Sequence, residues 1–192
     1  MRIPSWLNKI LVARSFGIDK PDDIRLEIIG ISAFLFWFIE STFGTISDFF
    51  PSLATLRPSS IVVLTFGILF GPVAALGGAI GTLIASLFGD INLGVIFVII
   101  GNFLLAYVGF IFWQILTKGE FTKFNFKYLA IFWLSCFIAS LVGALIIVGG
   151  YSWLNLPASF KIIFLNNFVW SAIFGPYIFN LVKRGALRNL FN

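Results

Sequence analysis

Polar side chains inside apolar stretches are the groups with which this chain could carry out chemistry. Glu40 lies near the end of one stretch, Asn102 lies within another, and the adjacent pair Asn166-Asn167 lies within a third. A carboxylate suits a cation or an amine, and an amide both donates and accepts hydrogen bonds. Aromatic residues that would provide flat walls lie at similar depth: Trp37, Tyr151, Trp153 and Trp170. Because polar groups at membrane depth are costly and tend to mark function, these residues predict a pocket for a small organic molecule.

Each of these residues also has a plainer interpretation. The tryptophans Trp37, Trp153 and Trp170 are equally consistent with packing or with anchoring at a membrane interface. Asn102 is equally consistent with a hydrogen bond to a neighbouring helix, and Glu40 with simple solvation near the interface. The sequence leaves both interpretations open for every one of them.

The pair Asn166-Asn167 is harder to explain by packing alone. Adjacent residues of a helix differ by about 100°, so the two amides cannot face one partner. Asp48 and Arg57, both in the expected first outer loop, would either pair with each other or close over a ligand.

Several classes of chemistry are excluded by the residue types. The chain has no histidine, which excludes histidine-based acid–base catalysis and histidine zinc sites. Its single cysteine, Cys136, allows neither a disulfide nor a cysteine metal cage within one chain. No phosphate-binding GxxxxGK[ST] motif occurs, so another protein must supply energy for any uphill transport. We therefore expect no enzymatic activity, no cofactor and no metal.

The composition predicts an all-α integral membrane protein. Of 192 residues, 59% are hydrophobic and 11% are charged, whereas soluble domains have about 25% charged residues. We expect residues 1–192 to form a single transmembrane domain, a compact bundle of six helices. A bilayer core of about 30 Å requires about 20 helical residues, and the second and third of the six apolar segments are shorter than that. The segments are 26–44, 60–71, 73–88, 93–116, 128–149 and 158–182.

The basic residues predict the orientation of these segments. Residues 1–25, 117–127 and 183–192 hold five, three and three basic residues, which is eleven of the thirteen in the chain. The positive-inside rule therefore places both termini in the cytoplasm. Charge does not distinguish two short crossings of residues 60–88 from a re-entrant hairpin. Residues 1–25 are expected to form a cytoplasmic amphipathic segment, and 183–192 a basic cytoplasmic tail.

Small residues dominate the second and third segments. The glycines Gly67, Gly71, Gly77, Gly78 and Gly81 allow helices to approach closely where lipid removes the hydrophobic driving force. Pro72 donates no backbone hydrogen bond and disfavours the α conformation at Gly71, so one straight helix is not expected. These residues predict a short helical hairpin packed inside the bundle.

Two stretches resemble a known family. LTFGILFGPVAALGGAIGTLI and LNNFVWSAIFGPYIF are similar to helices of the S components, the substrate-binding membrane subunits of energy-coupling factor (ECF) transporters. The resemblance implies capture of a vitamin-like nutrient at the outer face of the cell membrane. It also implies assembly with a membrane coupling subunit and two cytoplasmic ATPase subunits. The substrate-binding candidates that it implies are Glu40, Asn102, Trp153, Asn166, Asn167 and Trp170.

The chain departs from the family in one respect and also resembles other classes. S components often carry small residues at AxxxA spacing on the first helix, whereas this first segment offers Gly30 and Ala33. The nickel and cobalt branch is disfavoured because its site depends on an N-terminal histidine. The alternatives are a lipid-moving protein with re-entrant hairpins, which residues 58–81 also resemble, and a membrane sensor module.

Overall fold

The computed structural model describes residues 22–49, 57–88, 92–118 and 125–184, and these residues form helices joined by short connections. The expected cytoplasmic segment 1–25 and the tail 183–192 therefore lie largely outside the described residues. Six helices confirm the all-helical prediction: α2 Asp22–Phe49, α3 Ser60–Phe70, α4 Pro72–Leu87, α5 Val95–Thr117, α6 Phe126–Trp153 and α7 Phe160–Arg184.

Four of these helices are long and apolar enough to cross a membrane. They are α2, α5, α6 and α7, whereas α3 and α4 have 11 and 16 residues. The chain is therefore a membrane protein with transmembrane helices.

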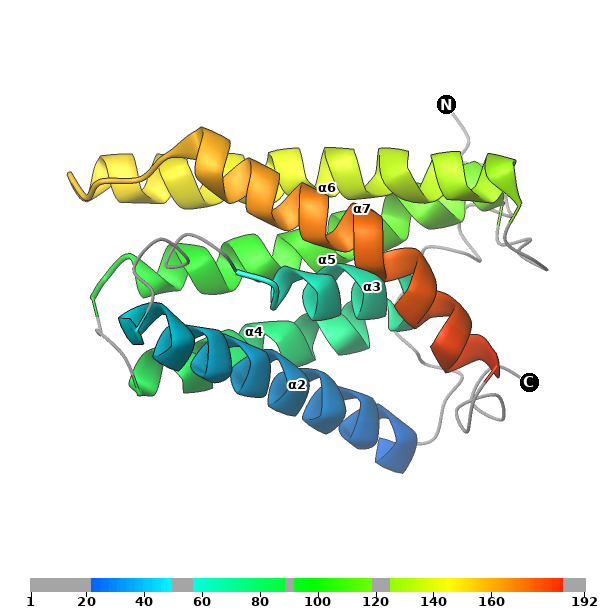
Figure 1. Cartoon of the computed structure of the whole chain (residues 1–192), viewed down its shortest axis with the longest axis horizontal. Helices are drawn as coiled ribbons and strands as arrows, with labels where there is room; N and C mark the ends of the chain where they lie inside the picture. The colour runs from blue at the N-terminus through cyan, green and yellow to red at the C-terminus, as the bar shows by residue number, and fades with distance from the viewer. Residues whose placement is uncertain (1–21, 50–56, 89–91, 119–124, 185–192) are drawn as a thin grey trace.

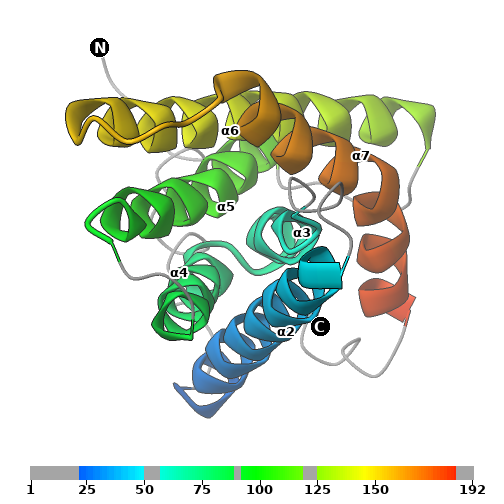
Figure 2. The same ribbon diagram turned by 60° about the vertical axis from the view of Figure 1, so that its left-hand side comes forward.

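Helix α3 lies near the centre of the bundle, with the other helices around it (Figure 2). It contacts α2, α4, α5 and α7, while α6 packs against α5 and α7. Helices α2, α4 and α6 finish at the end of the bundle where α5 and α7 begin, on the left of Figure 1. The six helices thus form one packed unit in which the shortest helix is the most central.

Two helices extend beyond the predicted bounds. Helix α2 continues to Phe49, so the backbone of Asp48 belongs to a helix and the prediction of a loop there was wrong. Helix α6 continues to Trp153, so Tyr151 and Trp153 lie in its last turn instead of following it. The pair Gly149-Gly150 lies inside α6, and a Cβ at Gly150 would overlap the Phe97 ring, so only glycine fits there.

The predicted interruption at Gly71-Pro72 is confirmed. Gly71 has φ 67° and ψ −144°, a conformation that glycine adopts without a Cβ clash. Pro72 is the first residue of α4, where a missing N–H costs no helical hydrogen bond. The chain therefore ends α3 and starts α4 within one residue.

Close helix approach occurs at three of the glycines predicted to serve it. A Cβ at Gly67 would lie 2.7 Å from the Ala106 Cα of α5, and a Cβ at Gly77 would lie 2.7 Å from the Ile29 carbonyl oxygen of α2. At Gly81 the Ala33 carbonyl oxygen of α2 would lie at 2.7 Å. Gly78 differs, because its nearest neighbour would be a Val63 side-chain methyl at 3.3 Å. Backbone contact therefore requires glycine at positions 67, 77 and 81 more strictly than at position 78.

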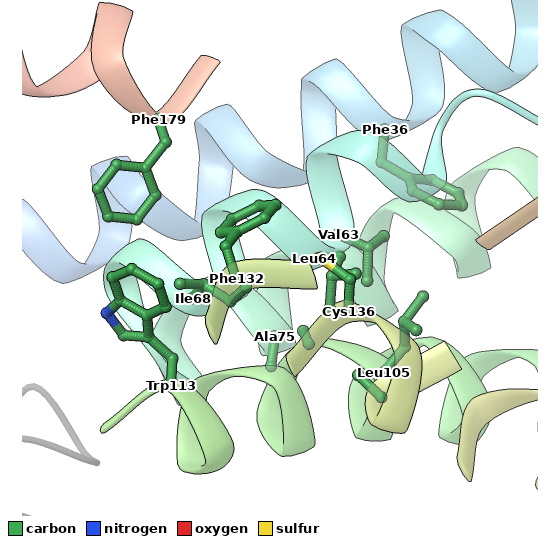
Figure 3. Close-up of a cluster of buried hydrophobic side chains, with 12 residues drawn as sticks. Phe36, Val63, Leu64, Ile68, Ala75, Leu105, Trp113, Phe132, Cys136 and Phe179 are labelled. Atoms are coloured by element: carbon green, nitrogen blue, oxygen red, sulfur yellow. The ribbon is translucent and has the colours of Figure 1, made fainter. Parts of the chain in front are cut away.

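An apolar core with residues from all six helices lies inside the bundle (Figure 3). The rings of Trp113, Phe132 and Phe179 contact one another, with centroids 5.5 to 6.2 Å apart. Aromatic pairs at such distances add to the stabilisation from burial alone. Phe179 thereby holds the second half of α7 against the bundle.

Candidate functional site

Glu40 and Arg57 form an ion pair between the last part of α2 and the residues that precede α3. The Arg57 Nη1 lies 3.5 Å from the Glu40 Oε1, and the Ser59 hydroxyl donates a hydrogen bond to the Glu40 Oε2. The Glu40 side chain is 22% exposed and that of Arg57 is 62% exposed. The carboxylate is therefore held by two partners while the guanidinium remains accessible.

Asn166 of α7 joins this pair. Its Oδ1 accepts a hydrogen bond from the Arg57 backbone N–H at 3.3 Å, and its backbone carbonyl accepts one from the Ser60 hydroxyl at 3.3 Å. The Asn166 Nδ2 donates to the Ile162 carbonyl of its own helix. We call Glu40, Arg57, Ser59, Ser60 and Asn166 the Glu40 cluster. It links three segments that are up to 126 residues apart in sequence, counting from Glu40 to Asn166.

Asn167 faces the interior beside this cluster. It belongs to a buried stripe of α7 at helical spacing, with Ser171, Gly175 and Phe179. The Ser171 hydroxyl donates to the Ser60 carbonyl at 3.2 Å, so this stripe packs on α3. Asn167 is 7% exposed, and its Nδ2 has no hydrogen-bond partner among the described residues. The two adjacent amides therefore face different surroundings, as the helical period requires.

Trp37 provides a second buried donor that lacks a hydrogen-bond partner among the described residues. Its Nε1 is buried without a partner among the described residues, and its ring packs on Phe88 with centroids 6.2 Å apart. Trp37 lies three residues before Glu40 and therefore on a neighbouring part of the same helix face. Unpaired buried donors cost free energy, so Trp37 and Asn167 are groups that a ligand acceptor would stabilise.

Asn102 is placed elsewhere. Its Nδ2 donates to the Thr82 hydroxyl at 2.9 Å, and that hydroxyl donates to the Gly78 carbonyl at 2.8 Å. Asn102 is 8% exposed and lies where α5 packs on α4. This is the interhelical hydrogen bond that the sequence allowed as the plainer interpretation.

Two predicted tryptophans make no hydrogen bond or ring contact with the Glu40 cluster among the described residues. Trp153 is 77% exposed, and its ring meets Phe97 edge-on with centroids 6.1 Å apart. Trp170 is half-buried and stacks on Phe174 of its own helix at 5.7 Å. Of the six predicted binding residues, the structure thus brings Glu40 and Asn166 together, with Asn167 adjacent.

Arg57 pairs with Glu40, whereas the Asp48 side chain lies outside the described residues, so its expected pairing with Arg57 stays a prediction. The sequence analysis also missed Ser59, Ser60 and Ser171. A signal for the first two was present, because Pro58-Ser59-Ser60 directly before an apolar run is a typical helix start. Nothing in the sequence alone connects Ser171 to Ser60, which is 111 residues away.

A groove of about 720 Å³ lies between the first part of α6 and the second part of α7, far along α7 from the Glu40 cluster. Its lining includes Asn125, Leu129, Trp133, Ile173, Tyr177 and Asn180, and we call it the Trp133 groove. The Trp133 Nε1 donates to the Ala172 carbonyl at 3.0 Å. In a helix, that carbonyl would accept from residue 176, which here is Pro176 and has no N–H. Trp133 therefore satisfies the backbone group that Pro176 leaves unpaired.

The Glu40 cluster offers an anion, an accessible cation and an amide, and the buried donors of Asn167 and Trp37 lie on the same two helices as Asn166 and Glu40. Among the described residues, no three side chains of the metal-ligating types lie close enough to hold a metal ion. Comparisons of the whole chain with models of protein families, with characterised proteins and with solved structures found no match.

Proposed function

We propose that this protein is the substrate-binding subunit of an energy-coupling factor type importer and that it captures a vitamin-like small organic nutrient. The observation that carries the proposal is the Glu40 cluster, which places a carboxylate, a guanidinium and an amide from three separate segments together inside a membrane protein. Glu40 and Asn166 belong to helices that can span a membrane, where polar groups are costly, and binding a polar solute is a function that accounts for them.

The two unpaired donors support the same proposal. The Nδ2 of Asn167 and the Nε1 of Trp37 lack partners among the described residues. A heterocycle with acceptor atoms on its edge would accept from a donor of this kind. Glu40 would bind a cationic or amino group of the same molecule, and Arg57 an anionic or carbonyl group.

The proposal includes a topology. Both termini lie in the cytoplasm, α3 and α4 form a hairpin that returns toward the outer face, and the Glu40 cluster faces outward. The cell membrane is the location, and a membrane coupling subunit with two cytoplasmic ATPases supplies the energy. The charge distribution and the resemblance to S components support these points.

The binding step is tested by native mass spectrometry of the protein extracted gently from its own membrane. We expect a bound molecule of a few hundred daltons on the unmodified protein and none on the Asn166→Ala variant. Asn180→Ala is the matched control, because it removes an amide from the other end of the same helix. A spectrum without any such adduct, or with an equal adduct on Asn166→Ala, would refute the assignment of this site.

The transport step is tested separately by isolating the protein from cross-linked native membranes. Recovery of one membrane protein and of ATPase subunits with phosphate-binding GxxxxGK[ST] motifs is the expected result. Isolation of the protein alone, with its small-molecule ligand bound, would keep the binding site and refute the importer.

A further inference from the structure

The Trp133 groove has an apolar floor whose hydrogen-bonding groups are already used. Pro176 removes the helical partner of the Ala172 carbonyl, and the Trp133 indole supplies a replacement at 3.0 Å. The floor therefore offers neither a free indole N–H nor this carbonyl to a polar ligand. What it presents is the face of Trp133 and the side chains of Leu129 and Ile173, which suit a hydrocarbon chain.

One end of the groove is polar, and its polar groups include donors. Asn125 uses its Oδ1 to accept from the Tyr128 backbone N–H at 3.0 Å, which leaves its Nδ2 as a donor. Asn180 lines the groove on the facing helix, and Tyr177, 76% exposed, carries a phenolic hydroxyl. Donors without competing carboxylates are the groups that bind a phosphate.

The basic residue near this end of the groove also favours an anionic ligand. Lys127 follows Asn125 by two residues and is exposed. Residues 125–184 contain no aspartate or glutamate. The groove is thus framed by two helices that carry positive but no negative side chains.

The geometry matches a chain that runs along the helices. From Asn125 to Trp133 and from Ala172 to Asn180 there are eight residues in each helix, a rise of about 12 Å. The two helices run in opposite directions in Figure 1 and separate toward the right, where α6 begins and α7 ends, so Asn125 and Asn180 both lie toward this end. Ile173 and Trp133 are 54% and 41% exposed, so the apolar part opens away from the core, where a membrane-spanning helix meets lipid.

We propose that the Trp133 groove binds an anionic phospholipid, with one acyl chain against Trp133 and Ile173 and the phosphate at Asn125 and Asn180. The site is independent of the proposed function, because it shares no residue with the Glu40 cluster. A bound lipid here would fix the relative position of α6 and α7 at the end where α7 carries Pro176.

The test is native mass spectrometry of the purified full chain in detergent with phosphatidylglycerol and phosphatidylcholine of identical acyl chains. We expect preferential retention of phosphatidylglycerol on the unmodified protein. Ile173→Trp fills the apolar part and should abolish that retention. Phe174→Trp is the matched control, because Phe174 is the next residue, is also exposed and does not line the groove.

A second variant tests the polar end with little change in size. Asn180→Asp places a negative charge beside the phosphate, and we expect about a tenfold smaller phosphatidylglycerol-bound fraction, the size of effect that follows loss of a hydrogen bond to a charged group. Equal retention of the two lipids by the unmodified protein would overturn the proposal. Unchanged retention by both folded variants, or a second polypeptide bound in place of lipid, would also overturn it.

Discussion

Helix α7 takes part in two regions of opposite character. In the Glu40 cluster, Asn166 and its neighbours hydrogen-bond to one another across three segments. In the Trp133 groove, Asn125, Tyr177 and Asn180 carry polar groups and the other lining residues are mainly apolar. In our two proposals, one helix serves a polar solute near its start and a lipid near its end.

The difference has a specific origin in each region. The Glu40 cluster depends on long-range side-chain contacts, because Arg57 and Asn166 are 109 residues apart. The groove depends on one local event, the loss of a backbone donor at Pro176, and on the Trp133 indole that replaces it. Each region can therefore be disrupted without the other.

The largest effect is expected from Gly81→Leu, which removes the scaffold that both regions share. The new side chain would meet the Ala33 carbonyl oxygen of α2, which lies 2.7 Å from the position of a Cβ. Because backbone cannot move aside as a side chain can, we expect a loss of about 3 kcal/mol or more. Thermal unfolding and size-exclusion chromatography in detergent measure it.

Gly30→Leu is the control for that variant, because nothing lies within 4 Å of a Cβ at Gly30. It should unfold within a few degrees of the unmodified protein and keep both ligands. Equal damage from the two substitutions would contradict the packing of α2 on α4.

The next largest effect separates the two regions. Glu40→Gln keeps the size of the side chain and an acceptor for Ser59 but removes the charge. We expect the affinity for the small-molecule ligand to fall by tenfold or more, because hydrogen bonds to charged groups contribute about 1.5–3 kcal/mol. Isothermal titration with the ligand identified by mass spectrometry measures it.

The same variant should change stability little, by less than about 1 kcal/mol, because the Arg57 partner is 62% exposed and such ion pairs contribute weakly. Lipid retention in the groove should be unaffected. Unchanged ligand affinity would remove Glu40 from the binding site.

A smaller effect tests whether the Trp133 indole compensates for the backbone hydrogen bond that Pro176 removes. Trp133→Phe leaves the Ala172 carbonyl without its donor, whereas Pro176→Ala restores the helical N–H. In a double-mutant cycle we expect a coupling of about 0.6–1.7 kcal/mol, the range seen for hydrogen bonds within membrane proteins. Additive effects in thermal or denaturant unfolding would show that Trp133 does not compensate for Pro176.

The smallest effect is expected at Asn102, which the sequence placed among the binding residues and the structure places between α4 and α5. Asn102→Ala removes the hydrogen bond to Thr82 and should cost about 0.6 kcal/mol. Binding of both ligands should persist in titrations of the variant. Loss of the small-molecule ligand would instead support the original assignment.

The sequence was sufficient to predict the elements because local rules determine them. Apolar length identifies the helices, and Gly71-Pro72 identifies the break, since φ 67° at Gly71 and a proline at the first turn follow from those residue types. The end of α6 was predicted too early, because Gly149-Gly150 resembles a stop signal. In the structure α6 continues past this pair, and Gly150 serves a close contact with Phe97 of α5.

The site was predictable only in part, because its contacts join distant segments. Glu40 and Asn166 were identified by their cost in a membrane, without regard to partners. The pairing of Glu40 with Arg57 depends on how the chain before α3 returns to α2, and no local pattern encodes that. Trp153 was selected by type alone, and in the structure it lies exposed against Phe97.

The most direct measurement of the central claim is one native mass spectrometry series in which both bound species are followed at once. The protein is extracted with its own lipids as the unmodified chain, as Asn166→Ala and as Ile173→Trp. The account predicts that Asn166→Ala loses the small molecule and keeps the phospholipid, and that Ile173→Trp does the reverse. Loss of both species from either folded variant, or of neither from both, would contradict two separate sites on α7.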